Sequence, residues 1–400
     1  MSQTNENQKG KSGVVIAVVL FFALVVGNYF QFQLTPLAGQ LMQQMDLSPN
    51  QFSSIFTSPM IASILFGIIA GVLVDKYGSK RIITIALVIA AAGLCCRPFA
   101  NSYPTFLACM ILGGMGITFL NVNMAKIIGG WFPPERTGPV IGLVMAGNNV
   151  GMTLGTATTA MLPSISVALW ISGAASILVV VLWILLAKDG PYTRTGEGSS
   201  ASLLDSLKPA LKSKNVWLVG ICLAFVMGCN LSLASFLPTA LASRGISESL
   251  SGLLASVLTI GGFCGTFFGP SVIAKLPRMK PALITCSILA ALCAAVAWRM
   301  APALAAVLLF LAGMFISALV PTFMSFPMLL PEIGPVYAGS AGGIITTLEL
   351  LGAVIIPTYV ITPLAGDNFQ LYFILAAVSI AVMTIFAIFL PELNKKKAGN

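Results

Sequence analysis

The chain contains no histidine, and charged residues make up only 8% of its 400 residues. An average soluble domain is about 25% charged, so a soluble protein of this composition would have too few charges to cover its surface. Hydrophobic residues make up 57% of the chain. We therefore expect most of the chain to lie in lipid rather than in water.

The residue types that most enzymes and metal centres need are absent or scattered. All eight cysteines lie within apolar runs, and none has the paired spacing of a zinc site. We find no nucleophile–base set and no cluster of metal ligands. The sequence therefore predicts that the protein is not an enzyme and binds no metal or cofactor.

Apolar stretches of about 20 residues, the length that crosses a bilayer, occur in two groups of six. The first group is 14–36, 52–74, 82–99, 104–131, 137–160 and 165–187. The second group is 216–242, 250–274, 282–299, 302–330, 334–360 and 369–391. We predict an all-α membrane protein with 12 transmembrane helices, in which bundles 1–187 and 215–400 flank a cytoplasmic linker, 188–214.

Lysine and arginine are distributed unevenly between the two sides of these spans. If the N-terminus is inside, 17 of the 21 basic residues lie in cytoplasmic segments. Three lie at outer edges, namely Arg97, Arg244 and Arg299, and Lys126 lies within a span. This bias predicts a multi-pass protein of the cytoplasmic membrane with both termini in the cytoplasm. We interpret Arg97 and Arg299 as anchors at the outer membrane interface.

The net charge of +9 follows from the same distribution. Most of the basic residues would face the anionic lipid of the inner leaflet, so membrane lipid is an expected partner and nucleic acid is not.

The two halves of the chain repeat each other in sequence. Matched pairs at constant offsets within each pair of spans are Asn28–Asn230 and Pro36–Pro238, Met115–Met314, and Gly142–Gly343 and Gly151–Gly352. The last of these registers sets Asn148 against Glu349. A repeat built of membrane helices is typical of a secondary transporter with its binding site between the halves.

The turn between the second and third spans reads GVLVDKYGSKRI, residues 71–82. A small Gly71 would let helices pack closely, Asp75 could accept hydrogen bonds, and Gly78 would allow a tight turn. Lys80 and Arg81 would hold the turn in the cytoplasm. In the second half, Ile273 stands where the aspartate would be.

This stretch resembles the loop signature of the major facilitator superfamily, approximately G-x-L-x-D-x-x-G-x-[RK]-[RK]. The resemblance extends to the twelve spans, the repeat, the long central loop and WFPPERTG after the fourth span. It implies two pseudo-symmetric six-helix bundles, transport by alternating access, and a gating role for Gly71, Asp75, Gly78, Lys80 and Arg81. The alternative is an ordinary positively charged cytoplasmic loop.

The motifs that mark particular subfamilies are mostly absent, and their absence excludes those subfamilies. The chain lacks the span-4 arginine of drug–proton antiporters, the Pro-Glu-Ser-Pro-Arg type sequence of sugar porters, and the arginines of nitrate porters in spans 2 and 8. What remains, including YFQFQLTPLAGQL, resembles the small-anion and carboxylate transporters, among them cyanate-permease-like and oxalate/formate-like groups.

Two ionisable side chains lie well inside predicted spans, where such groups are costly and usually functional. Glu349 could bind a proton or a cation, or could be a structural hydrogen-bonding group, neutral or paired with Lys126. Oxalate-type carriers have a basic residue near this position, so the charge here is reversed. Lys126 could attract an anionic substrate, or could extend toward the lipid headgroups without a role in transport.

Neutral polar residues complete the predicted substrate site, on spans that line the central cavity in the superfamily. The full set is Asn28, Gln31, Asn123, Lys126, Asn148, Asn149, Asn230, Ser325 and Glu349. One lysine among amides suits a small polar or anionic solute.

The leading hypothesis is a monomeric, proton-coupled transporter of a small organic anion, most simply a carboxylate. Its partners would be this small-molecule substrate and protons. Two alternatives stay open at this point. One is a carrier of cationic or zwitterionic solutes with Glu349 as counter-ion, and the other is an exchanger without proton coupling. A non-transporting sensor would need a soluble output domain, and we recognise none.

Overall fold

The computed structural model describes residues 2–132, 134–187, 203–276 and 278–392, and within these ranges the chain forms helices and no strands. The first helices are α1 (Ser2–Phe32), α2 (Ala38–Met45), α3 (Pro49–Tyr77), α4 (Ser79–Cys96), α5 (Tyr103–Gly129), α6 (Pro134–Thr158) and α7 (Ile165–Leu186). They are followed by α8 (Leu203–Lys212), α9 (Lys214–Ala242), α10 (Glu248–Lys275), α11 (Met279–Val296), α12 (Pro302–Leu329), α13 (Gly334–Ile355), α14 (Thr362–Ala365) and α15 (Phe369–Ile388).

Eleven of the helical segments in the described ranges are long and apolar enough to cross a membrane. The remaining long helix, α3, has 29 residues and lies where the second span is predicted. The prediction of an all-α, 12-helix membrane protein is therefore confirmed.

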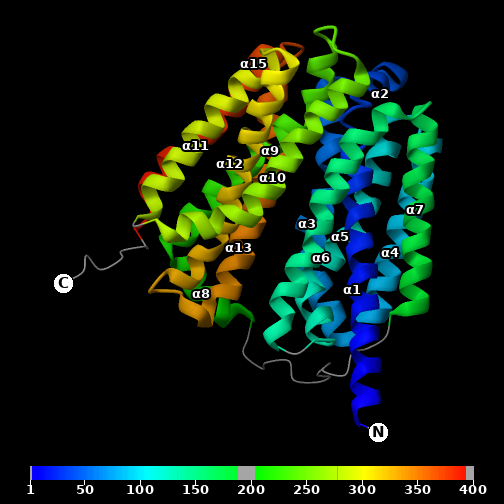
Figure 1. The fold of residues 1–400 in the computed structure, drawn as a ribbon, viewed down its shortest axis with the longest axis vertical. Coiled ribbons are helices and arrows are strands. Elements are labelled where there is room, and N and C mark those ends of the chain that lie inside the picture. The colour runs from blue at the N-terminus through cyan, green and yellow to red at the C-terminus, as the bar shows by residue number, and fades with distance from the viewer. Residues whose placement is uncertain (1, 133, 188–202, 277, 393–400) are drawn as a thin grey trace. The chain divides into compact units, whose positions relative to one another are not determined.

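The chain divides into two compact units. The first comprises residues 1–46 and 58–199, and the second comprises residues 47–57 and 200–400. In Figure 1 the second unit comprises the part from green to red together with the short blue segment of residues 47–57, and the first unit comprises the rest from blue to green. The predicted linker includes helix α8, and its residues 188–202 lie outside the described part. The predicted boundaries of two six-helix bundles stay a prediction.

Corresponding helices in the two units have the same construction. Helices α4 and α11 both have 18 residues, and each is followed by a three-residue 3-10 helix, η1 (Arg97–Phe99) or η3 (Ala297–Arg299). In the first unit α1 packs along α6, and in the second α9 packs along α13 (Figure 1). These equivalent pairings support the sequence repeat.

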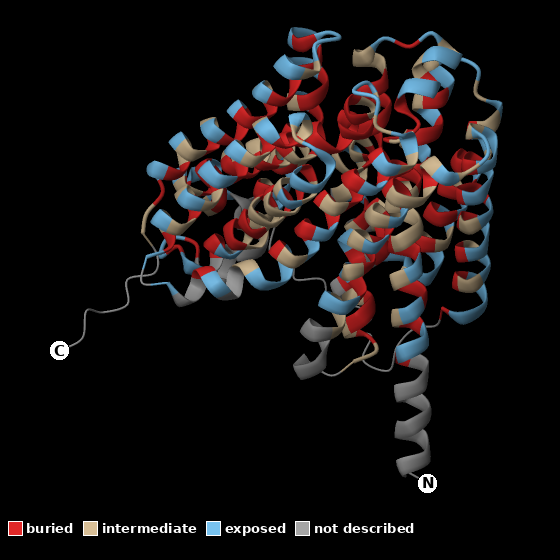
Figure 2. Cartoon of the chain, turned by 45° about the horizontal axis from the view of Figure 1, so that its top comes forward, coloured by how far each residue is buried: buried red, intermediate tan, exposed pale blue. Residues whose placement is uncertain are grey.

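Buried residues line the helix faces that meet other helices, and exposed residues lie on the outward faces (Figure 2). Close packing rather than a hydrophobic driving force holds membrane helices together, so small residues collect at the contacts. At Gly151 of α6 an added Cβ would overlap the carbonyl oxygen of Val25 in α1. At Gly352 of α13 it would overlap the backbone of Ala224 in α9. The matched glycines thus lie at matched contacts.

Candidate functional site

Asn28 and Asn148, two of the predicted site residues, are hydrogen-bonded to each other in the first unit. Asn28 Nδ2 donates to Asn148 Oδ1 at 2.7 Å and to the Leu24 carbonyl at 3.0 Å. The pair forms because α1 and α6 approach closely at Gly151, less than one turn after Asn148. Gln31 is buried further along α1, and Asn149 is half-buried beside Asn148.

Asn123 and Lys126 on α5 both donate to the backbone of α3. Asn123 Nδ2 lies 3.0 Å from the carbonyl oxygen of Phe119 and 3.4 Å from that of Ala70. Lys126 Nζ lies 3.5 Å from the carbonyl oxygen of Val74. In this conformation the two side chains therefore link α5 to the end of α3, just before the charged turn.

The charged turn has the backbone that its sequence predicts. Gly78 has φ +86°, a left-handed value that favours glycine, and it precedes the first residue of α4. Lys80 and Arg81 are exposed. The expectation that Gly71 is needed for close packing is wrong for this conformation, because an added Cβ would lie 3.8 Å from Val122 Cγ1, an ordinary contact. The side chain of Asp75 lies outside the described residues.

The second unit holds the other predicted site residues. Glu349 on α13 is 8% exposed, and no hydrogen bond or ion pair to its carboxyl group is found among the described residues. Asn230 on α9 is half-buried. Ser325 on α12 is exposed, and its hydroxyl donates to the carbonyl of Thr322 at 2.7 Å within the same helix. Ile273, which occupies the position of the loop aspartate in the second half, is buried.

Arg97 is not an anchor at the membrane interface, because its side chain is completely buried. Its guanidinium donates to the Phe30 carbonyl at 3.1 Å and to the hydroxyl of Ser172. The reason is the register of the two 3-10 helices, in which Arg97 corresponds to the buried Ala297. Arg299, two residues later in the repeat, is exposed, as an anchor would be.

A second buried cluster of polar side chains was not predicted from the sequence. Ser53 and Thr57, from the segment of α3 that belongs to the second unit, lie 3.2 and 3.0 Å from Thr358 Oγ1, hydroxyl to hydroxyl. Thr358 lies in a π-helical segment, η4 (Ile356–Ile361), and such segments are frequent at functional sites. The available signal was the four-residue spacing of Ser53 and Thr57, which places both on one helix face.

Glu332 lies just before α13, and its carboxylate links the beginning of α13 to the start of α9. Its Oε1 accepts from Asn215 Nδ2 at 2.7 Å and from the Ser213 hydroxyl at 3.1 Å. Partial burial raises the pKa of Glu332, but hydrogen bonds from Asn215, its own backbone and Ser213 lower it, and the pKa lies below its ordinary value. The resulting stabilisation is present above the ordinary carboxyl range and is lost as the pH falls through the lowered pKa.

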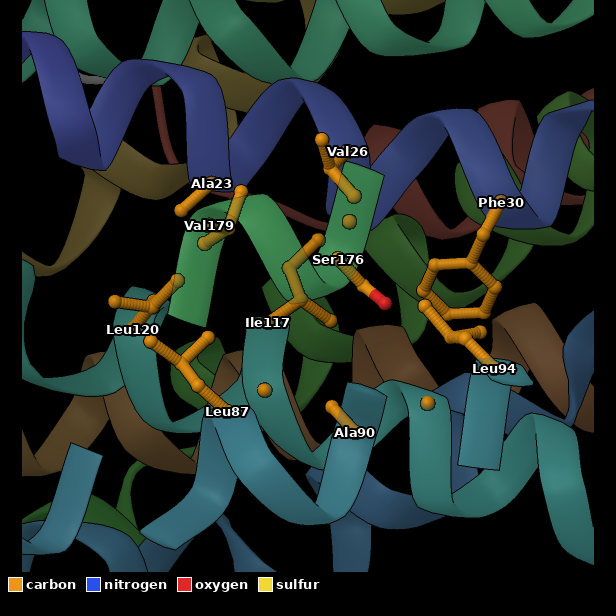
Figure 3. Close-up of a pocket in the computed structure, with 13 residues that line it drawn as sticks. Ala23, Val26, Phe30, Leu87, Ala90, Leu94, Ile117, Leu120, Ser176 and Val179 are labelled. Atoms are coloured by element: carbon orange, nitrogen blue, oxygen red, sulfur yellow. The ribbon is translucent and has the colours of Figure 1, made fainter. Parts of the chain in front are cut away.

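A small cavity of about 30 Å³ lies among α1, α4, α5 and α7 of the first unit (Figure 3). Aliphatic side chains and Phe30 line it, and its one side-chain oxygen belongs to Ser176. That hydroxyl already donates to the Gly173 carbonyl at 2.6 Å. An apolar cavity of this size stays dry, so it does not offer a site for a polar substrate.

The chain is similar in sequence to several transporters. The hexuronate transporter of Bacillus subtilis (strain 168) is 29% identical over 188 residues, 45% of this chain and 44% of that protein. The 3-(3-hydroxy-phenyl)propionate transporter of Escherichia coli (strain K12) is 22% identical over 297 residues, 73% of each chain. The cyanate transport protein CynX of the same strain is 24% identical over 245 residues, 61% of this chain and 63% of that protein. The chain thus spans less than half the length of the hexuronate transporter that it matches.

Solved structures share the fold at low sequence identity. The nucleoside transporter NupG has a TM-score of 0.77 at 14% identity, with 94% of this chain and 98% of that chain covered. The inward-open xylose transporter XylE from E. coli has a TM-score of 0.73 at 15% identity, with 96% and 98% covered. A family model described as the Major Facilitator Superfamily matches residues 17–357. The chain is therefore a multi-pass membrane protein that belongs to the Major Facilitator Superfamily, a family of transporters and not of enzymes.

Proposed function

We propose that this secondary transporter moves a small organic anion with a carboxylate group across the cytoplasmic membrane, by alternating access and with proton coupling. The substrate class is proposed because the compounds in the names of three similar transporters share one property. Hexuronate, hydroxyphenylpropionate and cyanate are all anions. Nitrate/nitrite antiporter NarK1 of Thermus thermophilus is also similar, although α3 and α10 here contain no arginine.

The residues available to such an anion are amides and one lysine. Asn28 Nδ2 donates to Asn148 Oδ1, and a carboxylate oxygen would be a stronger acceptor than this neutral amide. The 3.5 Å separation of Lys126 Nζ from the Val74 carbonyl is longer than an ordinary N–H···O hydrogen bond. Gln31, Asn123, Asn149, Asn230 and Ser325 remain proposed contacts.

Glu349 is the proposed proton-binding group. An ionised carboxylate in apolar surroundings is costly unless a charge or hydrogen bonds compensate it. Its side chain is buried, and the described residues provide it with neither. Protonation would remove the cost in one step of the cycle, and release of the proton would restore the charge in another.

The same isolation of Glu349 favours one alternative, a carrier of cationic or zwitterionic solutes in which the substrate supplies the compensating charge. An exchanger without proton coupling remains the other alternative. The three hypotheses differ in which ligands stabilise the protein and in whether flux depends on pH.

The first test is the thermal stability of the purified protein with a panel of small anions, cations and zwitterions. A ligand at 100 times its Kd stabilises the folded state by about 2.7 kcal/mol. We expect carboxylates to stabilise the wild type and the control Arg299→Gln, which loses an exposed cation, but not Lys126→Ala. If only cations or zwitterions stabilise the wild type, and Glu349→Gln abolishes the effect, the carrier of cationic or zwitterionic solutes replaces the leading proposal.

The second test is uptake into liposomes over a range of pH. We expect Glu349→Gln to lose the pH dependence of uptake, because glutamine cannot bind the transported proton. Asp367→Asn is the matched control, since it removes an exposed carboxylate between α14 and α15, and it should keep the wild-type profile. Full pH dependence in Glu349→Gln would rule out the coupling role.

A further inference from the structure

A second cavity of about 540 Å³ lies on the first unit, where the charged turn meets the end of α7. Its described lining consists of Tyr77, Gly78, Lys80, Arg81, Thr84, Ile85 and Ile184. Its described lining holds two cations and no carboxylate. The cavity therefore combines a positively charged end with an apolar wall.

The charged end is suited to a phosphate group. Gly78 has no side chain to cap α4, and the described residues supply no other side-chain cap to this helix start. The N–H groups of the first turn of α4 therefore remain available as donors, and the helix dipole favours an anion at this end. Lys80 and Arg81 lie in the same turn, and both side chains are exposed. The start of the helix and the two side chains thus favour negative charge at one place.

The apolar wall distinguishes a lipid from a soluble anion. Ile85 of α4 is 49% exposed, and Ile184 of α7 is 45% exposed. The two helices are held together here, because Trp183 Nε1 lies 3.5 Å from the carbonyl oxygen of Lys80. Val88 and Val181 continue the exposed apolar strip along the same two helices. A soluble phosphate would leave this strip uncovered, whereas an acyl chain would cover it.

We propose that the cavity between the charged turn and α7 binds one anionic phospholipid of the adjacent leaflet, with its phosphate at Lys80, Arg81 and the start of α4, and with an acyl chain against Ile85 and Ile184. The site lies at the boundary between polar and apolar residues, since Lys80 is the second residue of a membrane-spanning helix. Because the same turn is proposed to act in gating, the bound lipid would make transport sensitive to membrane composition.

The test is lipid binding measured by native mass spectrometry, with phosphatidylglycerol and phosphatidylcholine titrated onto the detergent-solubilised protein. We expect the wild type to retain one phosphatidylglycerol in preference to phosphatidylcholine. The double variant Lys80→Gln/Arg81→Gln should bind it about 25-fold more weakly, at about fivefold per cation removed. Lys76→Gln is the matched control, because Lys76 is an exposed cation of the same turn that does not line the cavity, and it should change binding less than twofold.

Equal weakening in Lys76→Gln and in the double variant would overturn the proposal, because it would indicate general attraction to a basic surface. A second measurement uses only the wild type and does not depend on the folding of a variant. We expect phosphatidylglycerol to raise the apparent melting temperature, and phosphatidylcholine or inorganic phosphate to leave it unchanged. An equal rise with inorganic phosphate would replace the lipid site with a site for a soluble anion.

Discussion

Among single residues, the buried guanidinium of Arg97 shares its acceptors with a neighbouring amide. Gln33 Nε2 lies 3.0 Å from the Ser172 hydroxyl and 3.3 Å from the Phe30 carbonyl, the two groups that Arg97 also reaches. Within the described residues no ion pair compensates the Arg97 charge. Burying a cation this way costs several kcal/mol unless its hydrogen bonds are good. Because Arg97 and Gln33 reach the same two acceptors, they are partly redundant donors.

This redundancy predicts non-additive effects. Arg97→Met and Gln33→Met should each cost little stability, because one donor remains for each acceptor. The double variant should lose more than the sum of the two, by about 0.5–3 kcal/mol, because both acceptors are then left without these donors. The free energies of unfolding of the four proteins in one detergent give the coupling directly. Additive losses would show that the two donors act independently.

Polar residues within the spans can be identified from the sequence more readily than their contacts can. Asn28 and Asn148 were both selected, but their direct hydrogen bond depends on the close approach of α1 and α6. Lys126 was left between two roles, which both stay predictions, and the sequence did not indicate its contact with the α3 backbone. A polar side chain can be recognised from its cost in lipid, whereas its partner depends on the neighbouring helix.

At the scale of helices, the contacts α1–α6 and α9–α13 each have their tightest glycine approach at one position, Gly151 or Gly352. Gly151→Ala or Gly352→Ala would force the paired helices apart, since the new methyl group would overlap backbone atoms of Val25 or Ala224. We expect each substitution to destabilise the protein by about 1–3 kcal/mol. Thermal unfolding in detergent would measure the loss.

The same helices offer matched controls. Gly142 of α6 and Gly343 of α13 are also related by the repeat, but an added Cβ at either would meet no atom within 4 Å. Gly142→Ala and Gly343→Ala should therefore leave stability unchanged or raise it by up to about 1 kcal/mol, through the higher helix propensity of alanine. Losses of similar size at all four positions would mean that helix packing is not the cause.

Helix irregularities were less predictable than helix contacts. Pro321 and Pro327 lie within α12, which continues from Pro302 to Leu329. A π-helical segment, η4, instead follows Ile355; it contains Pro357, and its Thr358 contacts Ser53 and Thr57. A proline shows where a backbone hydrogen bond is missing, but the surrounding helices determine how the backbone adjusts.

For the whole molecule, the distribution of basic residues makes a topological prediction that the fold alone does not test. Alkaline phosphatase, which is active only outside the cytoplasm, should be active when fused after Met300, between η3 and α12. It should be inactive when fused after Lys212, at the end of α8. Enzyme activity in intact cells measures both. The opposite pattern would reverse the predicted orientation and place the charged turn on the outer side.

The sequence by itself determined the number and the approximate positions of the membrane-spanning helices, the repeat and the family. These depend on properties local to a segment, such as an apolar length that matches the bilayer, or a glycine that permits the turn at Gly78. The tertiary structure alone decided that Arg97 is buried, that Asn28 meets Asn148, and that a basic turn and α7 line one open cavity. The physical reason is that a helix apolar on nearly all sides carries little periodic signal of its rotation about its own axis. Only its packing against neighbouring helices fixes which of its residues meet.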